Sequence, residues 1–274
     1  MLKKADTAWC PGCGDFPIRD VLEEALLELS IPMKDIVFTS GIGQAAKMPH
    51  YLDVNYMNGL HGRALPLAVG IKLVRPDLTV IACSGDGCNY GEGGNHFIHT
   101  IRRRLDITIL TLNNQVYGLT KGQSSPTTDL SVINDLSPAG NQNIPLNPVA
   151  LAITMGAPFV ARCCAADRHH MKEIVKGAIL FKGTAVVDIL QPCVTFNKIN
   201  TYQWLKERIY KIEKPTDDRY EALKTAELWG DRIPIGVIYR NDAAHCREIK
   251  TILCEKIRGE DIENQLNIRC VMMR

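Results

Sequence analysis

Four short apolar runs that alternate with helical patterns constrain the fold of this chain most strongly. Their apolar character is continuous rather than alternating, which is typical of strands covered on both faces, as in a parallel sheet. Turn-forming residues bound each run, and amphipathic periodicity fills the sequence between them. The pattern predicts an α/β fold with a doubly wound, mostly parallel sheet. The expected strands are residues 35–41, 78–87, 106–114 and 184–190, and the expected helices are residues 16–29, 63–74, 93–105 and 167–181.

Two further stretches differ from this alternation. From about Asn200 the sequence becomes charged and helical. We therefore divide the chain into an α/β domain at residues 1–199 and a C-terminal extension at residues 200–274, which we expect to pack on the domain or on a partner chain. Residues 115–148 form a long polar stretch rich in Gly, Pro, Asn, Ser and Thr. A long loop without secondary structure of its own is more often functional than idle.

The charge balance narrows the possible functions. The chain has 32 Lys and Arg residues against 30 Asp and Glu residues, and the two signs are interspersed. Nucleic-acid and membrane-surface binding both favour a basic face, so we expect neither. The first residues lack the apolar core of a signal peptide, and no apolar run is long enough to span a bilayer. These features predict a soluble cytoplasmic protein.

The chain contains 10 cysteines, which is many for 274 residues. In a reducing cytoplasm they are not expected to form a disulfide framework. Cys83 lies inside an apolar run and is interpreted as a small core residue. Cys10 and Cys13 form a CxxC pair in the stretch AWCPGCGDF, which is typical of a site that binds metal. Zinc is one candidate, but no second CxxC or histidine pair completes a zinc site.

Polar residues follow two neighbouring predicted strands at their carboxyl ends, where ligands of open α/β sheets bind. One strand ends in the turn Gly85–Asp86–Gly87, in which glycine lets the backbone approach a phosphate, and the next strand ends at Asn114. Oxygen atoms from Asp86, Asn114 and the backbone carbonyl of Val116 are ligands of the kind that Mg²⁺ prefers. Diphosphate oxygens and a water would complete its octahedron. GDG followed by NN at this spacing resembles the signature of thiamine diphosphate enzymes, which implies a Mg²⁺-diphosphate site. The alternative is that Asp86 caps a turn and Asn114 closes a strand.

Six stretches, in their order and spacing, resemble the β subunit of 2-oxoacid:ferredoxin oxidoreductases, and the 2-oxoglutarate type most of all. They are WCPGCGD, SGIG, HGRALPLAVGIKL, GDGCNYGEGGNHFIH, NNQVYGLTKGQSSPT and QPCVTFN. The resemblance covers nearly the whole chain, including the tail DRIPIGVIY. It implies the thiamine diphosphate-binding fold and the oxidative decarboxylation of a 2-oxoacid to an acyl-CoA and CO₂, with electrons passed to ferredoxin. The favoured substrates are 2-oxoglutarate and coenzyme A.

The resemblance also implies partners and further site residues. In this family the pyrimidine-binding domain belongs to an α subunit, so we expect the chain to be inactive alone and to form a dimer of αβ heterodimers. His61 precedes a helix start that could face phosphate, and capping or core packing is its alternative role. The residues expected to bind the cofactor are His61, Gly85, Asp86, Gly87, Asn114, Val116, Gly118 and Leu119.

A 4Fe–4S cluster is implied at the CxxC pair. By the resemblance Cys10, Cys13 and Cys193 are its ligands, while the family's remaining cysteine follows SGIG at the position of Gln44. Iron in such clusters prefers soft thiolates to an amide. The cluster is therefore expected to be three-iron, to borrow another ligand, or to be absent. The candidate substitute ligands are Cys88, Cys163 and Cys164.

Two lysines match substrate-proximal positions of the family. The distal carboxylate of a dicarboxylic 2-oxoacid needs a cation, and Lys47 and Lys121 both lie in loops expected near strand ends. The alternative is that each is an ordinary solvated lysine. Two other functions stay open: a non-redox thiamine diphosphate-dependent 2-oxoacid decarboxylase subunit, which Gln44 favours, and a non-catalytic scaffold subunit stabilised by zinc.

Overall fold

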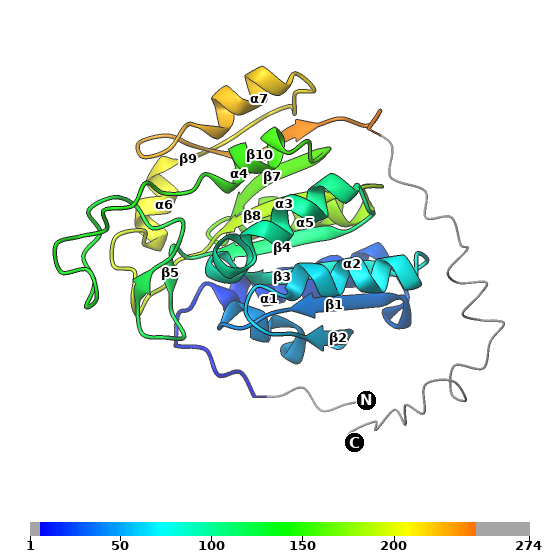
Figure 1. Ribbon diagram of the computed structural model, residues 1–274, viewed down its shortest axis with the longest axis horizontal. Coiled ribbons are helices and arrows are strands. Elements are labelled where there is room, and N and C mark those ends of the chain that lie inside the picture. The colour runs from blue at the N-terminus through cyan, green and yellow to red at the C-terminus, as the bar shows by residue number, and fades with distance from the viewer. Residues whose placement is uncertain (1–5, 245–274) are drawn as a thin grey trace.

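The computed structural model describes residues 6–244. Within them one sheet of eight strands has the order β2-β1-β3-β4-β8-β7-β10-β9 (Figure 1). All neighbouring strands are parallel except the antiparallel pair β7 and β10. The predicted α/β fold with a mostly parallel sheet is therefore confirmed. The strands are β1 (Ile36–Ser40), β2 (Asn55–Asn58), β3 (Thr79–Gly85), β4 (Thr108–Asn113), β7 (Phe159–Cys164), β8 (Ala185–Leu190), β9 (Ile209–Lys211) and β10 (Ile233–Arg240).

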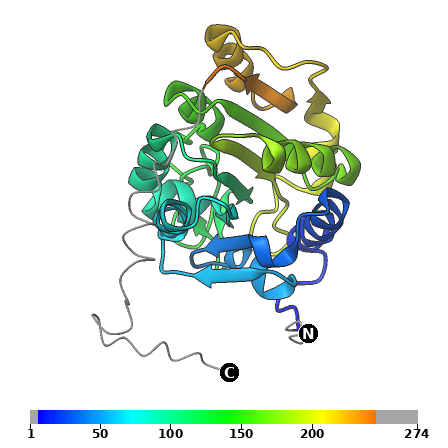
Figure 2. The ribbon, with the colours of Figure 1, turned by 90° about the vertical axis from the view of Figure 1, so that its right-hand side faces the viewer.

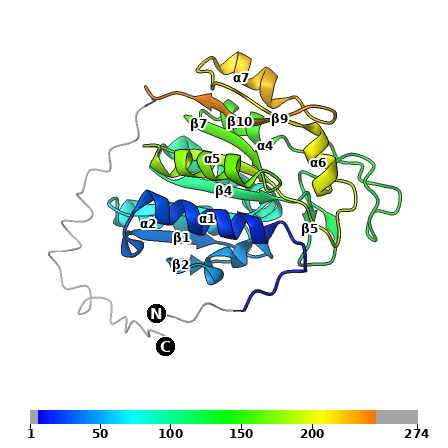
Figure 3. The ribbon, with the colours of Figure 1, turned by 180° about the vertical axis from the view of Figure 1, so that it is seen from behind.

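Helices cover both faces of the sheet, as the view in Figure 2 shows. Helices α1 and α5 pack side by side on the face nearest the viewer in Figure 3, and α2, α3 and α4 cover the opposite face. The helices are α1 (Asp15–Leu29), α2 (Ala64–Val74), α3 (Gly94–Arg103), α4 (Pro148–Thr154), α5 (Arg168–Leu180), α6 (Tyr202–Arg208) and α7 (Arg219–Ala226). A π-helix, Gly87–Glu92, precedes α3, and 3₁₀ helices occupy Met33–Asp35 and Ala45–Tyr51.

Alternate side chains of the central strands enter two separate cores. In β3, Ile81 and Cys83 pack in the core that contains α1 and α5. Val80 and Ala82 pack in the core that contains α2 and α3. A strand with apolar neighbours on both faces has no polar side, which explains the continuous apolar runs in the sequence.

The four strands and four helices expected from the sequence are all present, with bounds that differ by a few residues. The other four strands of the sheet, β2, β7, β9 and β10, were not expected. The edge strand β2 is short and exposed and has the sequence NYMN, and β7 carries Arg162 in its centre. Pro234 and Gly236 interrupt the apolar pattern of β10. Each of these sequences lacks the uninterrupted apolar run on which the prediction depended.

The described part of the C-terminal extension joins the sheet. Its last strand, β10, pairs with β7, so that Gly236 lies opposite Arg162. Helix α7 packs on α4 and on β10. The division at residue 200 stays a prediction, and residues 245–274 lie outside the described part of the chain.

The carboxyl ends of β1, β3, β4 and β8 meet at one edge of the sheet because these neighbours are parallel. The loops that follow these strands lie on the left in Figure 1, together with the N-terminal segment that leads into α1. Within residues 115–148 a short hairpin of β5 (Val116–Tyr117) and β6 (Gln123–Ser124) precedes the rest of the polar stretch. None of the described helices has the length and apolar character needed to cross a membrane.

Candidate active site

A cleft at the carboxyl edge of the sheet, which we call the diphosphate cleft, brings together the residues predicted to bind the cofactor. Its walls come from the loops after β1, β3 and β4 and from the turn before α2. The predicted residues that line it are His61, Gly85, Asp86, Gly87, Asn114, Val116, Gly118 and Leu119. The free volume within the cleft is about 60 Å³. Residues predicted from three separate motifs therefore share one site, and their roles there remain predictions.

Two hydroxyl groups hold the carboxylate of Asp86 in the cleft. Its Oδ2 atom accepts hydrogen bonds from Ser125 Oγ at 2.5 Å and from Thr127 Oγ1 at 2.7 Å. Asp86 is 2 % exposed. Burial raises its pKa, while the two hydroxyl donors act in the opposite direction. A bound divalent cation would favour the ionised carboxylate, so the buried position suits a metal ligand better than a free charge.

The two asparagines at the end of β4 point to different sites. Asn114 lines the diphosphate cleft, and its Oδ1 accepts a hydrogen bond from the backbone N–H of Val116 at 3.0 Å. Asn113 donates instead to Asp188 Oδ1 at 3.1 Å and accepts from Thr127 Oγ1 at 2.9 Å. Thr127 therefore contacts both Asp86 and Asn113 and links the cleft to the interior beside it.

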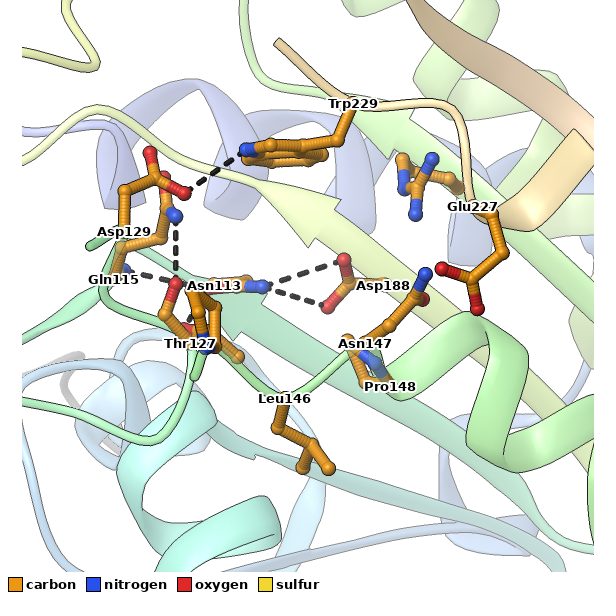
Figure 4. Close-up of a pocket in the computed structure, with 12 residues that line it drawn as sticks. Asn113, Gln115, Thr127, Asp129, Leu146, Asn147, Pro148, Asp188, Glu227 and Trp229 are labelled. Atoms are coloured by element: carbon orange, nitrogen blue, oxygen red, sulfur yellow. Dashed lines mark hydrogen bonds between the residues drawn. The ribbon is translucent and has the colours of Figure 1, made fainter. Parts of the chain in front are cut away.

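That interior contains a second cavity of about 180 Å³, drawn in Figure 4. Figure 4 shows Asn113 between Asp188 and the side chains of Thr127 and Gln115. Asp188 is 2 % exposed, and burial raises its pKa to about 6. Arg162 also lines the cavity and is buried. Its guanidinium lies 5.5 Å from the ring centre of Trp229. Hydrogen bonds with residues around this cavity hold Asn113, at the end of β4, in place. None of the residues predicted to bind the cofactor lines the cavity.

A missing side chain at Gly87 allows the turn after β3 to form the floor of the diphosphate cleft. A Cβ atom at this position would lie 2.2 Å from Cε1 of Tyr117, so the ring and the turn could not both stay in place. The close contact fixes the hairpin that begins at Val116 against the turn that carries Asp86. Glycine at this position therefore serves the packing of the site.

A third pocket, which we call the cysteine pocket, lies next to the diphosphate cleft. It is lined by the three predicted cluster ligands and by the glutamine at the expected fourth position: Cys10, Cys13, Cys193 and Gln44. These residues come from the N-terminal segment, the loop after β8 and the loop after β1. Gln44, Asn114 and Gly118 line both the pocket and the cleft. The two sites therefore share a wall.

The cysteine pocket contains a buried carboxylate that the sequence reasoning missed. Asp15 is 1 % exposed, and its Oδ2 accepts a hydrogen bond from the thiol of Cys13 at 3.4 Å. Burial raises the pKa of Asp15 to about 7. Burial, followed by the charge of Asp15, also raises the pKa of Cys13 well above its usual range. Because only a thiolate binds iron, metal binding here must displace a tightly held proton.

The proposed substitute ligands do not lie in the cysteine pocket, which corrects that expectation. Cys88 lines the diphosphate cleft, where its Sγ accepts a hydrogen bond from the N–H of Gly62 at 3.2 Å. Cys163 and Cys164 are buried in β7, and Cys164 packs against Leu190. Both lie in the sheet core, because the strand has apolar neighbours on each face.

Within residues 6–244 no group of three or more His, Cys, Asp or Glu side chains is arranged to hold one metal ion. A zinc ion needs four ligands that converge on a single atom. A cluster differs, because each thiolate binds a different iron atom. Within the described residues the three cysteines of the pocket are therefore not arranged as the ligands of one zinc ion.

The two lysines predicted near the substrate lie outside both sites. Lys47 is half-buried in the 3₁₀ helix Ala45–Tyr51, and Lys121 is exposed in the turn between β5 and β6. Lys121 has a φ of 86°, a left-handed conformation that is uncommon for a residue with a side chain. Neither lysine lines the diphosphate cleft or the cysteine pocket. Their roles stay predictions.

The hydroxyls of Ser125 and Thr127 were also missed by the sequence reasoning. They lie in the stretch QSSPTT, only a few residues after the hairpin, and the hydroxyl-rich composition was the available signal. Spacing alone did not show that the stretch returns to Asp86. That contact depends on the hairpin reversing the chain beside the turn after β3.

Comparison with known proteins first defines the class. Residues 39–189 match the family model "Thiamine pyrophosphate enzyme, C-terminal TPP binding domain". Residues 193–251 match the model of the C-terminal part of the pyruvate ferredoxin oxidoreductase beta subunit. The first match spans the residues that line the diphosphate cleft, and the second begins at Cys193. The chain therefore contains a thiamine diphosphate-binding domain of the ferredoxin oxidoreductase type.

Relatives define the family. The chain is 45% identical over 249 residues to the 2-oxoacid:ferredoxin oxidoreductase subunit beta of Saccharolobus solfataricus, covering 85% of this chain and 82% of that protein. It is 37% identical over 266 residues to the 2-oxoglutarate synthase subunit KorB of Archaeoglobus fulgidus, covering 94% of each. The chain belongs to the family of 2-oxoacid:ferredoxin oxidoreductase β subunits.

A solved structure supports the same fold. The 2-oxoglutarate:ferredoxin oxidoreductase from Magnetococcus marinus, with 2-oxoglutarate, coenzyme A and succinyl-CoA bound, superimposes with a TM-score of 0.88. The identity is 34%, and the match covers 97% of this chain and 92% of that chain. The oxidoreductase class follows from these names.

Proposed function

We propose that this chain and an α subunit together catalyse the CoA-dependent oxidative decarboxylation of 2-oxoglutarate and pass the electrons to ferredoxin. The observation that carries the proposal is the wall shared by the diphosphate cleft and the cysteine pocket. A decarboxylase that transfers no electrons needs only the diphosphate cleft. An electron-transferring enzyme needs both, side by side, so that electrons released at the cofactor have a short exit.

The residues of the cleft fit thiamine diphosphate with Mg²⁺. Asp86, the Asn114 amide and the Val116 carbonyl supply the oxygen donors that Mg²⁺ prefers. When bound, thiamine diphosphate supplies the electron sink that decarboxylation of a 2-oxoacid requires. The chain would hold the diphosphate and its Mg²⁺ through these oxygen donors, and Ser125 and Thr127 would keep the Asp86 carboxylate ionised and in place.

The residues of the cysteine pocket fit an iron–sulfur cluster with one departure. Cys10, Cys13 and Cys193 supply three thiolates, and Gln44 replaces the fourth. A cluster here would accept electrons one at a time and deliver them to ferredoxin. Free thiols also require a reducing compartment, so we propose a cytoplasmic location.

The substrate proposal rests on relatives and on charge. Several relatives are named as 2-oxoglutarate enzymes, and the Magnetococcus structure contains 2-oxoglutarate and coenzyme A. The second carboxylate of 2-oxoglutarate needs a cation, for which Lys47 and Lys121 remain the candidates. Because neither lines the cleft in the single chain, we propose that residues of the α subunit close the pocket beside them and that two αβ heterodimers assemble.

The test is an anaerobic co-purification of the chain with its α subunit, followed by CoA-dependent ferredoxin reduction with 2-oxoglutarate or pyruvate. We expect a higher kcat/KM for 2-oxoglutarate, and no activity from the chain alone. Lys121→Met should raise KM for 2-oxoglutarate about tenfold, the worth of one charge-assisted hydrogen bond, and leave pyruvate unchanged. Lys182→Met, at an 83%-exposed lysine, is the matched control. Equal preference for pyruvate would contradict the substrate assignment.

A second candidate is the non-redox decarboxylase subunit, which the absent fourth thiolate at Gln44 favours. It predicts release of CO₂ and an aldehyde without coenzyme A or an electron acceptor. A complex that lacks iron but still consumes 2-oxoglutarate would support it. The zinc-stabilised scaffold predicts a complex that binds zinc and does not bind thiamine diphosphate in the presence of Mg²⁺.

A further inference from the structure

We propose that the cluster in the cysteine pocket is held by three thiolates and that its fourth corner is bound by the side-chain oxygen of Gln44. This inference rests on the function proposed above, and it concerns the chemistry of one iron atom. An iron bound by a neutral oxygen is held less firmly than one bound by a thiolate. The cluster would then have one exchangeable corner, next to the site where electrons are released.

The pocket contains an excess of buried oxygen atoms without partners. Gln44 Oε1, Asp15 Oδ1 and Gln191 Oε1 are all buried and accept no hydrogen bond within the described chain. Gln44 and Asp15 line the pocket, and Gln191 Nε2 lies 3.6 Å from the Sγ of Cys13. A buried acceptor without a donor is unfavourable, and two such oxygens in the lining of one pocket, with a third beside it, point to a bound group that accepts an electron pair, as an iron atom does.

Gln44 is the better ligand of the two that line the pocket. Oδ2 of Asp15 already accepts the hydrogen bond from Cys13. A carboxylate ligand would also add a fourth negative charge to the three thiolates around the pocket, whereas an amide oxygen adds none. Gln44 lies on the wall shared with the diphosphate cleft, and its backbone is fixed because its carbonyl accepts a hydrogen bond from Trp9 Nε1 at 3.0 Å. The loop that carries it is therefore held in place.

No other cysteine within residues 6–244 lines this pocket. Three more cysteines, Cys246, Cys254 and Cys270, lie outside the described residues. They are the rival source of a fourth thiolate, and the experiment includes them.

The iron at the exchangeable corner can be lost when the cluster is oxidised by one electron. A one-electron oxidant such as ferricyanide converts [4Fe–4S]²⁺ into [3Fe–4S]⁺ and Fe²⁺, with one electron passing to the oxidant. Loss of the iron breaks only its bonds to sulfide and to the Gln44 oxygen. The oxidised three-iron cluster is paramagnetic, whereas the oxidised four-iron cluster gives no EPR signal, so the two states are directly distinguishable.

The experiment titrates the anaerobically purified αβ complex with ferricyanide and follows the EPR signal and the released Fe²⁺. We expect wild type to release one iron per cluster and to gain the signal. Gln44→Cys should slow iron release at least about tenfold, and Gln44→Ala should speed it by a similar factor. Gln203→Cys, which adds a thiol at an exposed glutamine, is the control and should behave as wild type.

Three results would overturn the inference. Equal rates for wild type and Gln44→Ala would show that the Gln44 oxygen does not bind iron. A stable four-iron cluster in wild type that becomes labile in the triple variant C246S/C254S/C270S would assign the fourth corner to a C-terminal thiolate. These two results overturn this inference alone, whereas a complex without iron and sulfide would overturn the electron-transfer function as well.

Discussion

The diphosphate cleft and the cysteine pocket share a wall but differ in how far the protein completes them. In the cleft, Asp86 accepts two hydroxyl hydrogen bonds and Asn114 accepts one from the backbone. In the cysteine pocket, Asp15 and Gln44 each keep a buried oxygen without a donor. The cleft therefore organises its polar groups internally, whereas the polar groups of the pocket need a bound group to satisfy them.

The largest expected effect comes from removing the carboxylate of the cleft. Asp86→Asn should weaken Mg²⁺-dependent binding of thiamine diphosphate on the order of a thousandfold, about 4 kcal/mol, because a buried charge loses its partner. Calorimetric titration of the αβ complex measures it, with the exposed Asp231→Asn as control. The iron content should not change. Loss of iron together with the cofactor would show that the two sites are not independently organised.

The next effect is a pH dependence of the free energy of unfolding that comes from Asp188, in the cavity beside the diphosphate cleft. Burial raises the pKa of Asp188 from 3.8 to about 6, so the folded state binds this proton more tightly than the unfolded state. The stabilisation is complete below pH 3.8 and is lost as the pH rises through 6, by about 3 kcal/mol.

Denaturant unfolding of the chain without cofactors, between about pH 4 and 7, measures this contribution. Asp188→Asn should make the free energy of unfolding depend less on pH over that range. An unchanged pH dependence in the variant would mean that burial does not raise the pKa of Asp188 and that this side chain adds nothing to the pH dependence of stability.

A smaller effect tests whether the hydroxyl groups organise the cleft. Thr127→Val keeps the shape of the side chain and removes its hydrogen bonds to Asp86 and Asn113. We expect Mg²⁺ affinity to fall about tenfold, as for other residues that orient a metal ligand. Thr225→Val, in α7, is the matched control. An unchanged Mg²⁺ affinity would show that the Thr127 hydroxyl does not hold Asp86 in position for the metal, which would contradict the contrast between the two sites.

The same contrast explains what could be predicted from the sequence. Asp86 and Asn114 follow strands that neighbour each other in the sheet, so strand order alone brings them to one edge. The cysteine pocket joins the N-terminal segment to loops after β1 and β8, and only the family resemblance indicated that Cys10 and Cys193 meet. Asp15, Ser125 and Thr127 escaped prediction because their roles depend on side-chain contacts that no periodicity records. Edge strands such as β2 escaped because they are short and exposed and have no continuous apolar run.

The most direct test of the account is the structure of the αβ complex with thiamine diphosphate and Mg²⁺, determined with anomalous scattering from iron. The account predicts Mg²⁺ bound by Asp86, Asn114 and the Val116 carbonyl, and an iron signal among Cys10, Cys13 and Cys193 across the wall that contains Gln44. A diphosphate bound elsewhere, or a cysteine pocket whose walls meet without iron, would contradict it.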